Sequence, residues 1–181
     1  MEDYSPSHQD LVDRTAEWLS KHPKYKCRLV FKEVRTVIKE IPDVIGFTKY
    51  GRSILIECKA SRSDFLSDSK KSFRKRASLG IGLERFYACP KDLISVDELP
   101  SNWGLIYVYE NQIRIKAHPQ KQNNNVNNEN KFLISVLAKL DFLKPIDESL
   151  AEYTEGFKTA LGKKEAKRSA KRAKRRRRRR R

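Results

Sequence analysis

The stretch Pro42-Asp43-Val44-Ile45-Gly46-Phe47, together with Ser53-Ile54-Leu55-Ile56-Glu57-Cys58-Lys59, decides the fold of this chain. Both apolar runs are short, which is typical of buried strands rather than of helices. Between them, Lys49-Tyr50-Gly51 predicts a three-residue hairpin loop, because Gly51 can adopt the left-handed conformation that such loops require. The two segments are therefore expected to form a β-hairpin.

The register of this hairpin follows from its loop. If Thr48 pairs with Arg52, counting back along both strands sets Asp43 opposite Glu57. Side chains alternate along a strand, so Glu57 and Lys59 share a face, and directly opposed residues have Cβ atoms about 4.5–5.5 Å apart. We expect two carboxylates and an amine to converge.

Two carboxylates held this close repel each other unless a counter-charge is present. A divalent cation supplies one, and Mg²⁺ or Mn²⁺ accepts the hard oxygen ligands of Asp and Glu. A bound cation would activate water and hold a phosphate oxygen, while Lys59 could stabilise developing negative charge. This chemistry is phosphodiester hydrolysis. The alternative is an exposed ion pair at a strand edge, since acid-x-Lys occurs four times in the chain.

Pro42-Asp43 followed by Glu57-Cys58-Lys59 resembles the motif of the PD-(D/E)XK nuclease superfamily. The downstream segments 61–70 and 85–90 resemble the MmcB-like group, a bacterial and phage branch associated with DNA repair. The resemblance covers about residues 7–109. It implies a restriction-endonuclease-like core of αβββαβ order, with a mixed central sheet flanked by helices.

The resemblance also implies the roles of individual residues. Asp43, Glu57 and the backbone carbonyl of Cys58 correspond to metal ligands, and Lys59 corresponds to the catalytic lysine. Glu33 matches an acidic position of the group and is a further candidate ligand of the metal or of water. The implied cofactor is Mg²⁺ or Mn²⁺.

Periodicity supports this order of elements. A Ser5-Pro6-Ser7 cap predicts a helix through Ser20 with His8 on its inner face, where we expect a structural histidine rather than a phosphate ligand. Residues 28–38 alternate as a strand that would place Glu33 on the same face as Phe31. A strand over 85–89 is expected to join in parallel, and residues 104–116 predict a terminal hairpin.

A cationic cluster follows the motif. Ser61 or Ser63 caps a helix that begins acidic and ends basic, which suits the helix dipole. We expect this cluster to contact a phosphate backbone rather than merely to face solvent. The residues proposed to bind nucleic acid there are Arg62, Lys70, Lys71, Arg74, Lys75 and Arg76.

The charge of +17 lies mostly in the last residues. Residues 163–181 contain fourteen Lys or Arg and one Glu, which leaves +4 for residues 1–162. Such a run predicts a disordered arm that binds polyanions without base specificity, with Arg175, Arg178 and Arg181 among its contacts. The alternatives are a localisation signal and an artificial terminus.

The remaining features organise the chain. Residues 1–119 are expected to form the nuclease-like core, 120–130 an Asn-rich linker, 131–162 a helical extension and 163–181 the basic tail. Neither a membrane span nor a secretory signal is apparent, and the three cysteines indicate buried thiols. These features indicate a soluble intracellular protein, and the resemblance implies the cytoplasm of a bacterial or phage-infected cell.

The leading prediction is a metal-dependent deoxyribonuclease acting in DNA repair or phage nucleic-acid processing. One alternative is a non-catalytic nucleic-acid-binding module that uses the same fold and basic tail. Another is an RNA-processing enzyme, because no residue pattern distinguishes a 2′-hydroxyl. The expected partner is DNA or RNA rather than a membrane, and a homodimer is compatible with double-strand cleavage.

Overall fold

The computed structural model describes residues 4–140 of the chain. The expected basic tail, with Arg175, Arg178 and Arg181, lies outside the described residues, as does most of the expected helical extension. Within residues 4–140, no helix is long and apolar enough to cross a membrane.

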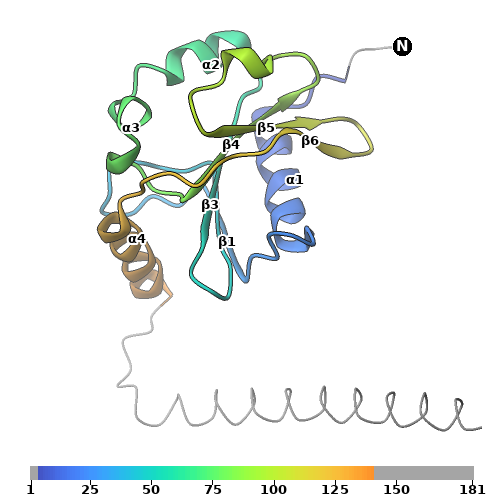
Figure 1. The fold of residues 1–181 in the computed structure, drawn as a ribbon. Helices are drawn as coiled ribbons and strands as arrows, with labels where there is room; N and C mark the ends of the chain where they lie inside the picture. The colour runs from blue at the N-terminus through green and yellow to red at the C-terminus, as the bar shows by residue number, and fades with distance from the viewer. Residues whose placement is uncertain (1–3, 141–181) are drawn as a thin grey trace, which may run out of the picture. The chain divides into compact units, whose positions relative to one another are not determined.

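A single mixed sheet runs through the described part, in the spatial order β1-β2-β3-β4-β5-β6 (Figure 1). Its strands are β1 (Leu29–Lys32), β2 (Val44–Phe47), β3 (Ser53–Cys58), β4 (Glu84–Pro90), β5 (Trp103–Val108) and β6 (Ile113–Ala117). The pairs β3–β4 and β4–β5 are parallel, and the other neighbouring pairs are antiparallel. The chain is thus an α+β fold, and the predicted parallel strand and terminal hairpin are confirmed.

The hairpin between β2 and β3 has the predicted register. Gly51 has a φ of +77°, and the Thr48 amide donates to the Arg52 carbonyl at 2.9 Å. Val44 pairs with Ile56, so one step further along the two strands Asp43 faces Glu57. The loop chemistry therefore fixes which residues meet at the other end of the hairpin.

Helices cover both faces of this sheet (Figure 1). On one face lies α1 (His8–Lys21), whose Leu11 and Leu19 pack with the inward residues of β3 and β4. On the other face lie α2 (Arg62–Asp68), α3 (Ser72–Lys75) and α4 (Val126–Lys139). Because both faces are covered, every residue of β3 is buried, which explains its continuous apolar run.

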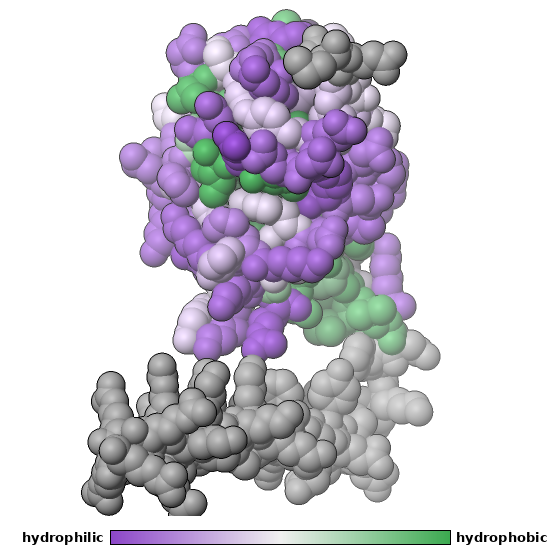
Figure 2. Space-filling model, turned by 90° about the vertical axis from the view of Figure 1, so that its right-hand side faces the viewer, coloured by the Kyte–Doolittle hydropathy of each residue, from purple (hydrophilic) through white to green (hydrophobic). Residues whose placement is uncertain are grey.

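Charged and polar residues cover most of the surface seen from the side of α1 and the β5–β6 hairpin (Figure 2). The helix α1 begins at the predicted cap, where Ser7 and Asp10 form a reciprocal capping box. Its buried residues, including Leu11, Val12 and Leu19, face the sheet. The amphipathic pattern therefore directs one stripe of α1 into the core.

The strand expected over residues 28–38 is shorter in the structure. It ends at Lys32, because Glu33 takes a left-handed backbone conformation with a φ of +49°. The Glu33 amide still donates to the Asp43 carbonyl at 3.0 Å. The chain then leaves the sheet and returns at Val44, which places Glu33 and Asp43 beside each other.

The Asn-rich stretch also differs from its expected role as a linker. The helix α4 starts at Val126, inside that stretch, and its Phe132 is fully buried in the core. Before the helix, the Asn125 amide donates to the Gly80 carbonyl at 2.8 Å. The buried Glu129 carboxylate accepts from Ser53 Oγ at 2.7 Å. Long-range pairing thus anchors a segment whose polar composition resembles that of a flexible linker.

Candidate active site

Asp43 lies at the start of β2, beside the end of β3. One of its oxygens, Oδ2, accepts a hydrogen bond of 2.7 Å from the Cys58 amide. Burial and the nearby negative charge of Glu57 raise the pKa of Asp43 to about 6, against the lowering effect of the Cys58 amide. A negative charge on Asp43 is therefore unfavourable beside the charge of Glu57 unless a positive charge compensates it.

Two further side chains approach Asp43 from other elements. His8 Nε2, in the first turn of α1, lies 3.7 Å from Asp43 Oδ1 and 3.4 Å from Glu33 Oε1. One ligand atom from each of the three residues lies within 4.8 Å of the others. We call this group the His8–Glu33–Asp43 cluster. It joins the first turn of α1, the end of β1 and the start of β2.

Glu33 reaches this cluster in a way that strand alternation did not predict. Phe31 faces the opposite side of the sheet, where its ring lies 5.6 Å from the ring of Phe132 on α4. The left-handed turn at Glu33 breaks the alternation and lets its side chain contact His8. His8 was expected to be structural, and its position directly after the Ser7 cap was the available signal that it lies at an exposed helix end.

Glu57 is nearly inaccessible, with 2% of its side chain exposed. Its Oε2 lies 2.8 Å from Arg74 Nη2 and 3.8 Å from Lys59 Nζ, although the contact with Arg74 Nη2 is not aligned as a hydrogen bond. Its other oxygen, Oε1, is buried and has no hydrogen-bond partner among residues 4–140. A buried carboxylate oxygen normally has such a partner, so Oε1 is an exception.

Lys59 is held in place by several carboxylates. Its side chain is 3% exposed, and Nζ lies 3.3 Å from Asp68 Oδ1 and 3.5 Å from Asp64 Oδ1. Burial alone would lower the pKa of Lys59, but the negative charges of Glu57 and Asp68 raise it overall. The ammonium is therefore a fixed positive charge next to Glu57.

Asp68 is the centre of this ion network. Its side chain is fully buried, and Oδ2 accepts from Arg74 Nε at 2.6 Å and from the Tyr87 hydroxyl at 2.7 Å. Burial would raise the pKa of Asp68, but the charge of Arg74, aided by Lys71 and Lys59, holds it well below the usual range. Asp68 is thus an anion at neutral pH, and it lies between three cations.

Arg74 was expected to contact nucleic acid, but only 2% of its side chain is exposed. Its guanidinium lies between Glu57, Asp68 and Glu40, with Nη1 2.8 Å from Glu40 Oε1. Burial would lower the pKa of Arg74, yet these three carboxylates raise it overall. Arg74 therefore pairs with buried carboxylates, and no local pattern predicts its contact with Glu40, 34 residues away.

The other predicted cations divide into groups. Arg62 makes a bidentate pair with Glu98 at 2.9 and 2.6 Å, which occupies a guanidinium that was expected to bind nucleic acid. Lys71 lies 2.6 Å from Asp68 Oδ1. Lys70 and Arg76 are exposed and make no ion pair within the described residues. The side chain of Lys75 lies outside the described part.

The structure thus brings Asp43, Glu57 and Lys59 to one end of the β2–β3 hairpin, but gives the two carboxylates different partners. Asp43 joins the cluster on the α1 side, and Glu57 joins the ion network on the α2–α3 side. The charge of Glu57 nevertheless acts on Asp43. Such a pair of linked acidic groups beside a lysine can hold a cation and polarise a phosphate.

No family model matches this chain, and no curated protein matches it. A solved structure, that of a protein of unknown function from Silicibacter pomeroyi, is similar to it with a TM-score of 0.54. The two sequences are 21% identical, and the match covers 80% of this chain and 97% of the other. This likeness shows the fold alone.

Proposed function

We propose that this chain is a metal-dependent nuclease that hydrolyses phosphodiester bonds in DNA on a restriction-endonuclease-like core. The observation that carries the proposal is the meeting of Asp43, Glu57 and Lys59, in which Glu57 Oε1 is buried and has no partner in the described part of the chain. An orphaned carboxylate oxygen beside a carboxyl of raised pKa is what a cation-binding site presents without its cation. The proposed setting is DNA repair or phage nucleic-acid processing in the bacterial cytoplasm.

The residues present fit a divalent cation. Asp43 Oδ1, Glu33 Oε1 and His8 Nε2 lie close enough to share one ion, and Glu57 Oε1 needs a partner. Two carboxylates suit Mg²⁺ or Mn²⁺, and the imidazole nitrogen favours Mn²⁺ over Mg²⁺. When bound, such a cation would lower the pKa of water and oppose the negative charge of a phosphate. The Cys58 carbonyl remains a predicted further ligand.

The chain's own groups would prepare this chemistry. The Cys58 amide fixes one oxygen of Asp43 and leaves the other directed to His8. Lys59 is fixed by Asp68 and Asp64, so its positive charge stands beside Glu57 without a change of rotamer. A preorganised ammonium can stabilise negative charge that develops on a phosphate oxygen. Asp68 thus acts as a positioning residue for Lys59.

A second candidate function is a non-catalytic nucleic-acid-binding module. The observation that favours it is the ion network itself, because Arg74 and Lys59 already oppose the charge of Glu57. On that account the acidic group is structural and needs no metal. The binding module would retain its affinity for nucleic acid after Asp43→Asn and Glu57→Gln. It would also give no cleavage product with any metal ion.

The proposed function is tested by cleavage of single-stranded, duplex and branched DNA and of RNA with Mg²⁺ or Mn²⁺. Wild type is compared with Asp43→Asn, Glu57→Gln and Lys59→Ala, each first shown to be folded. We expect wild type to cut at least one DNA substrate and all three variants to lose that activity. Binding of every substrate without cleavage of any would overturn the nuclease proposal and leave the binding module.

A further inference from the structure

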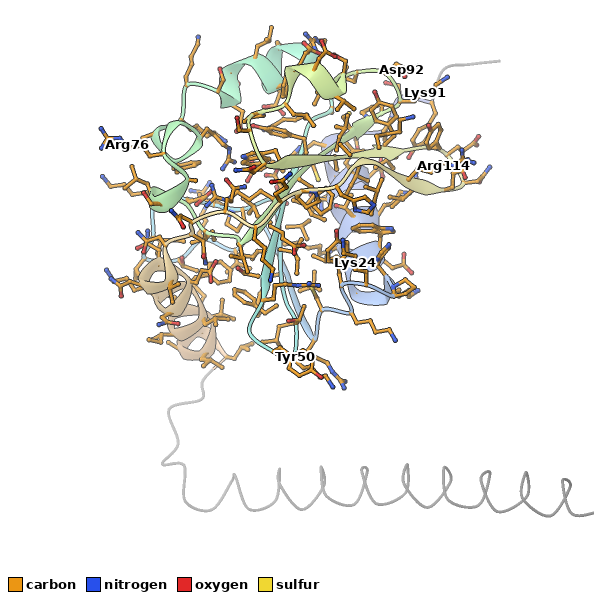
Figure 3. The ribbon with its side chains drawn as sticks, in the orientation of Figure 1. Lys24, Tyr50, Arg76, Lys91, Asp92 and Arg114 are labelled. Atoms are coloured by element: carbon orange, nitrogen blue, oxygen red, sulfur yellow. The ribbon has the colours of Figure 1, made fainter. Side chains whose placement is uncertain are left out.

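A surface hollow of about 640 Å³ begins at the end of α3 and is lined by none of the residues that form the candidate active site. It is bordered by Arg76 and Ser78 near the short 3₁₀ turn Ala77–Leu79, by Asn102 before β5, and by residues 121–123 before α4. Figure 3 shows Arg76 projecting outward from the end of α3. The hollow is thus built by three segments that are distant in the sequence.

The hollow is cationic. Arg76 and Lys121 are exposed, neither makes an ion pair within residues 4–140, and no carboxylate is among the lining residues. Most of the remaining lining groups are amides and a hydroxyl. An arrangement of two unpaired cations without an acid attracts anions and favours a phosphate group.

A third positive charge lies beneath the hollow. Arg85 is fully buried, and its guanidinium donates to the carbonyls of Ala77 at 2.7 Å and Asn123 at 3.5 Å, both of which line the hollow. Within the described residues it makes no ion pair. The charge of Glu40 acts on Arg85, but the two Glu40 oxygens accept hydrogen bonds from Arg74 and from the Ile81 amide. A buried cation without its own carboxylate strengthens the attraction of an anion.

The hollow also presents groups that can recognise a base. Gln122 is 9% exposed, and its Nε2 is buried without a hydrogen-bond partner in the described part of the chain. This nitrogen is covered by the protein, so the amides that a ligand in the hollow can reach are those of other lining residues. Asn102 and Asn123 are exposed and offer both donors and acceptors.

We infer that this hollow binds a nucleotide unit, with its phosphate on Arg76 and Lys121 and its base edge on the amides of Asn102 and Asn123. Drug-sized ligands occupy hollows of about 300–1,000 Å³, so the volume admits one nucleotide. The unit is either a free mononucleotide or one residue of a nucleic acid strand. The inference stands without any hydrolysis at Asp43 and Glu57, and it goes beyond the proposed function.

The test is an NMR titration of the full chain in the presence of EDTA, so that neither metal nor cleavage contributes. The probes are inorganic phosphate, a mononucleotide and a 5′-phosphorylated dinucleotide. The backbone amides of Ala77, Ser78 and Asn123 report the hollow, while the amides of residues 163–181 report binding to the basic tail separately. The double variant Arg76→Gln with Lys121→Gln is compared with the charge-matched control Arg114→Gln with Lys24→Gln, whose residues Figure 3 shows elsewhere on the surface.

We expect saturable shifts of the hollow amides with the mononucleotide or the dinucleotide, and weaker binding of inorganic phosphate. Loss of each cation should weaken binding about tenfold, because a hydrogen bond to a charged group contributes roughly one factor of ten. The control pair should leave the affinity unchanged. Tighter binding of the dinucleotide would identify a nucleic acid strand as the source, and equal binding a free nucleotide.

Three results would overturn the inference. The first is the absence of a saturable shift at the hollow amides with any probe. The second is equal weakening by the Arg76/Lys121 variant and by the control pair, which would indicate only general charge attraction. The third is equal affinity for inorganic phosphate and for the nucleotides, which would exclude recognition of a base.

Discussion

Asp68→Asn removes one charge from the centre of the ion network and leaves the size of the side chain unchanged. Asp68 is fully buried and contacts Lys59 at 3.3 Å and Arg74 at 2.6 Å. Removing one partner of a buried ion pair costs about 3–5 kcal/mol, because the remaining charges stay buried without compensation. We therefore expect the free energy of unfolding to fall by about that amount, and the melting temperature to fall by about 10 °C.

The matched control is Asp64→Asn, which removes a second carboxylate 3.5 Å from Lys59 Nζ. The Asp64 side chain is 44% exposed, so water screens its charge and the loss should stay below about 1 kcal/mol. Urea unfolding followed by circular dichroism measures both variants. If Asp68→Asn costs no more than Asp64→Asn, burial does not make Asp68 the centre of the network and the reasoning fails.

Double-mutant analysis separates charge from packing. Lys59→Met alone leaves Asp68 with Arg74 and Lys71, and the combination with Asp68→Asn removes both members of one contact. Residues in direct contact show coupling energies of about 0.5–3 kcal/mol. A coupling energy near zero would mean that Lys59 is not positioned by Asp68.

The remaining predictions concern pH, packing, thiols and the tail. Because the pKa of Asp68 in the folded state lies below its ordinary value of 3.8, its contribution to stability is present above that pH and is lost as the pH falls. The difference in unfolding free energy between wild type and Asp68→Asn should therefore be constant at neutral pH and shrink below about pH 4. A difference independent of pH would contradict this. Gly82→Ala should destabilise by about 1–3 kcal/mol in urea unfolding, since Gly82 has a φ of +89° and an added Cβ would lie 2.5 Å from Leu55 Cβ; unchanged stability would refute it. Burial raises the pKa of Cys58, so this thiol should resist alkylation until the protein unfolds, and rapid reaction in the native state would show that it is accessible. Deletion of residues 163–181 should reduce the salt dependence of nucleic-acid binding without changing metal binding, and an unchanged slope would exclude the tail as an electrostatic arm.

Local rules predicted the parts of the fold that depend on near neighbours. The hairpin register followed from Gly51 and from strand alternation, and it correctly set Asp43 opposite Glu57. The cap at Ser7 followed from its side-chain chemistry. These features involve residues close in sequence, where turn and cap geometry leave few alternatives.

Features that depend on distant contacts were not predicted. Arg74 was identified as a surface cation, but its partner Glu40 lies across a loop, and only tertiary packing shows that the two meet. Glu33 was placed by alternation, which its left-handed backbone conformation interrupts. The composition of the Asn-rich stretch predicts a linker, because composition does not show that Glu129 accepts hydrogen bonds from Ser53 and from the Gly82 amide. At each of these positions, contacts between residues distant in the sequence or an unusual backbone conformation determine the structure, and the local sequence pattern does not show them.

The most direct test of the central claim is the binding of Mn²⁺ to the full chain, measured by electron paramagnetic resonance of free and bound ion. The His8–Glu33–Asp43 cluster predicts saturable binding that Asp43→Asn abolishes and His8→Asn weakens. The control variant Asp97→Asn should bind as wild type does. Absence of saturable binding in wild type, or binding that survives Asp43→Asn unchanged, would contradict a divalent-cation site at the end of this hairpin.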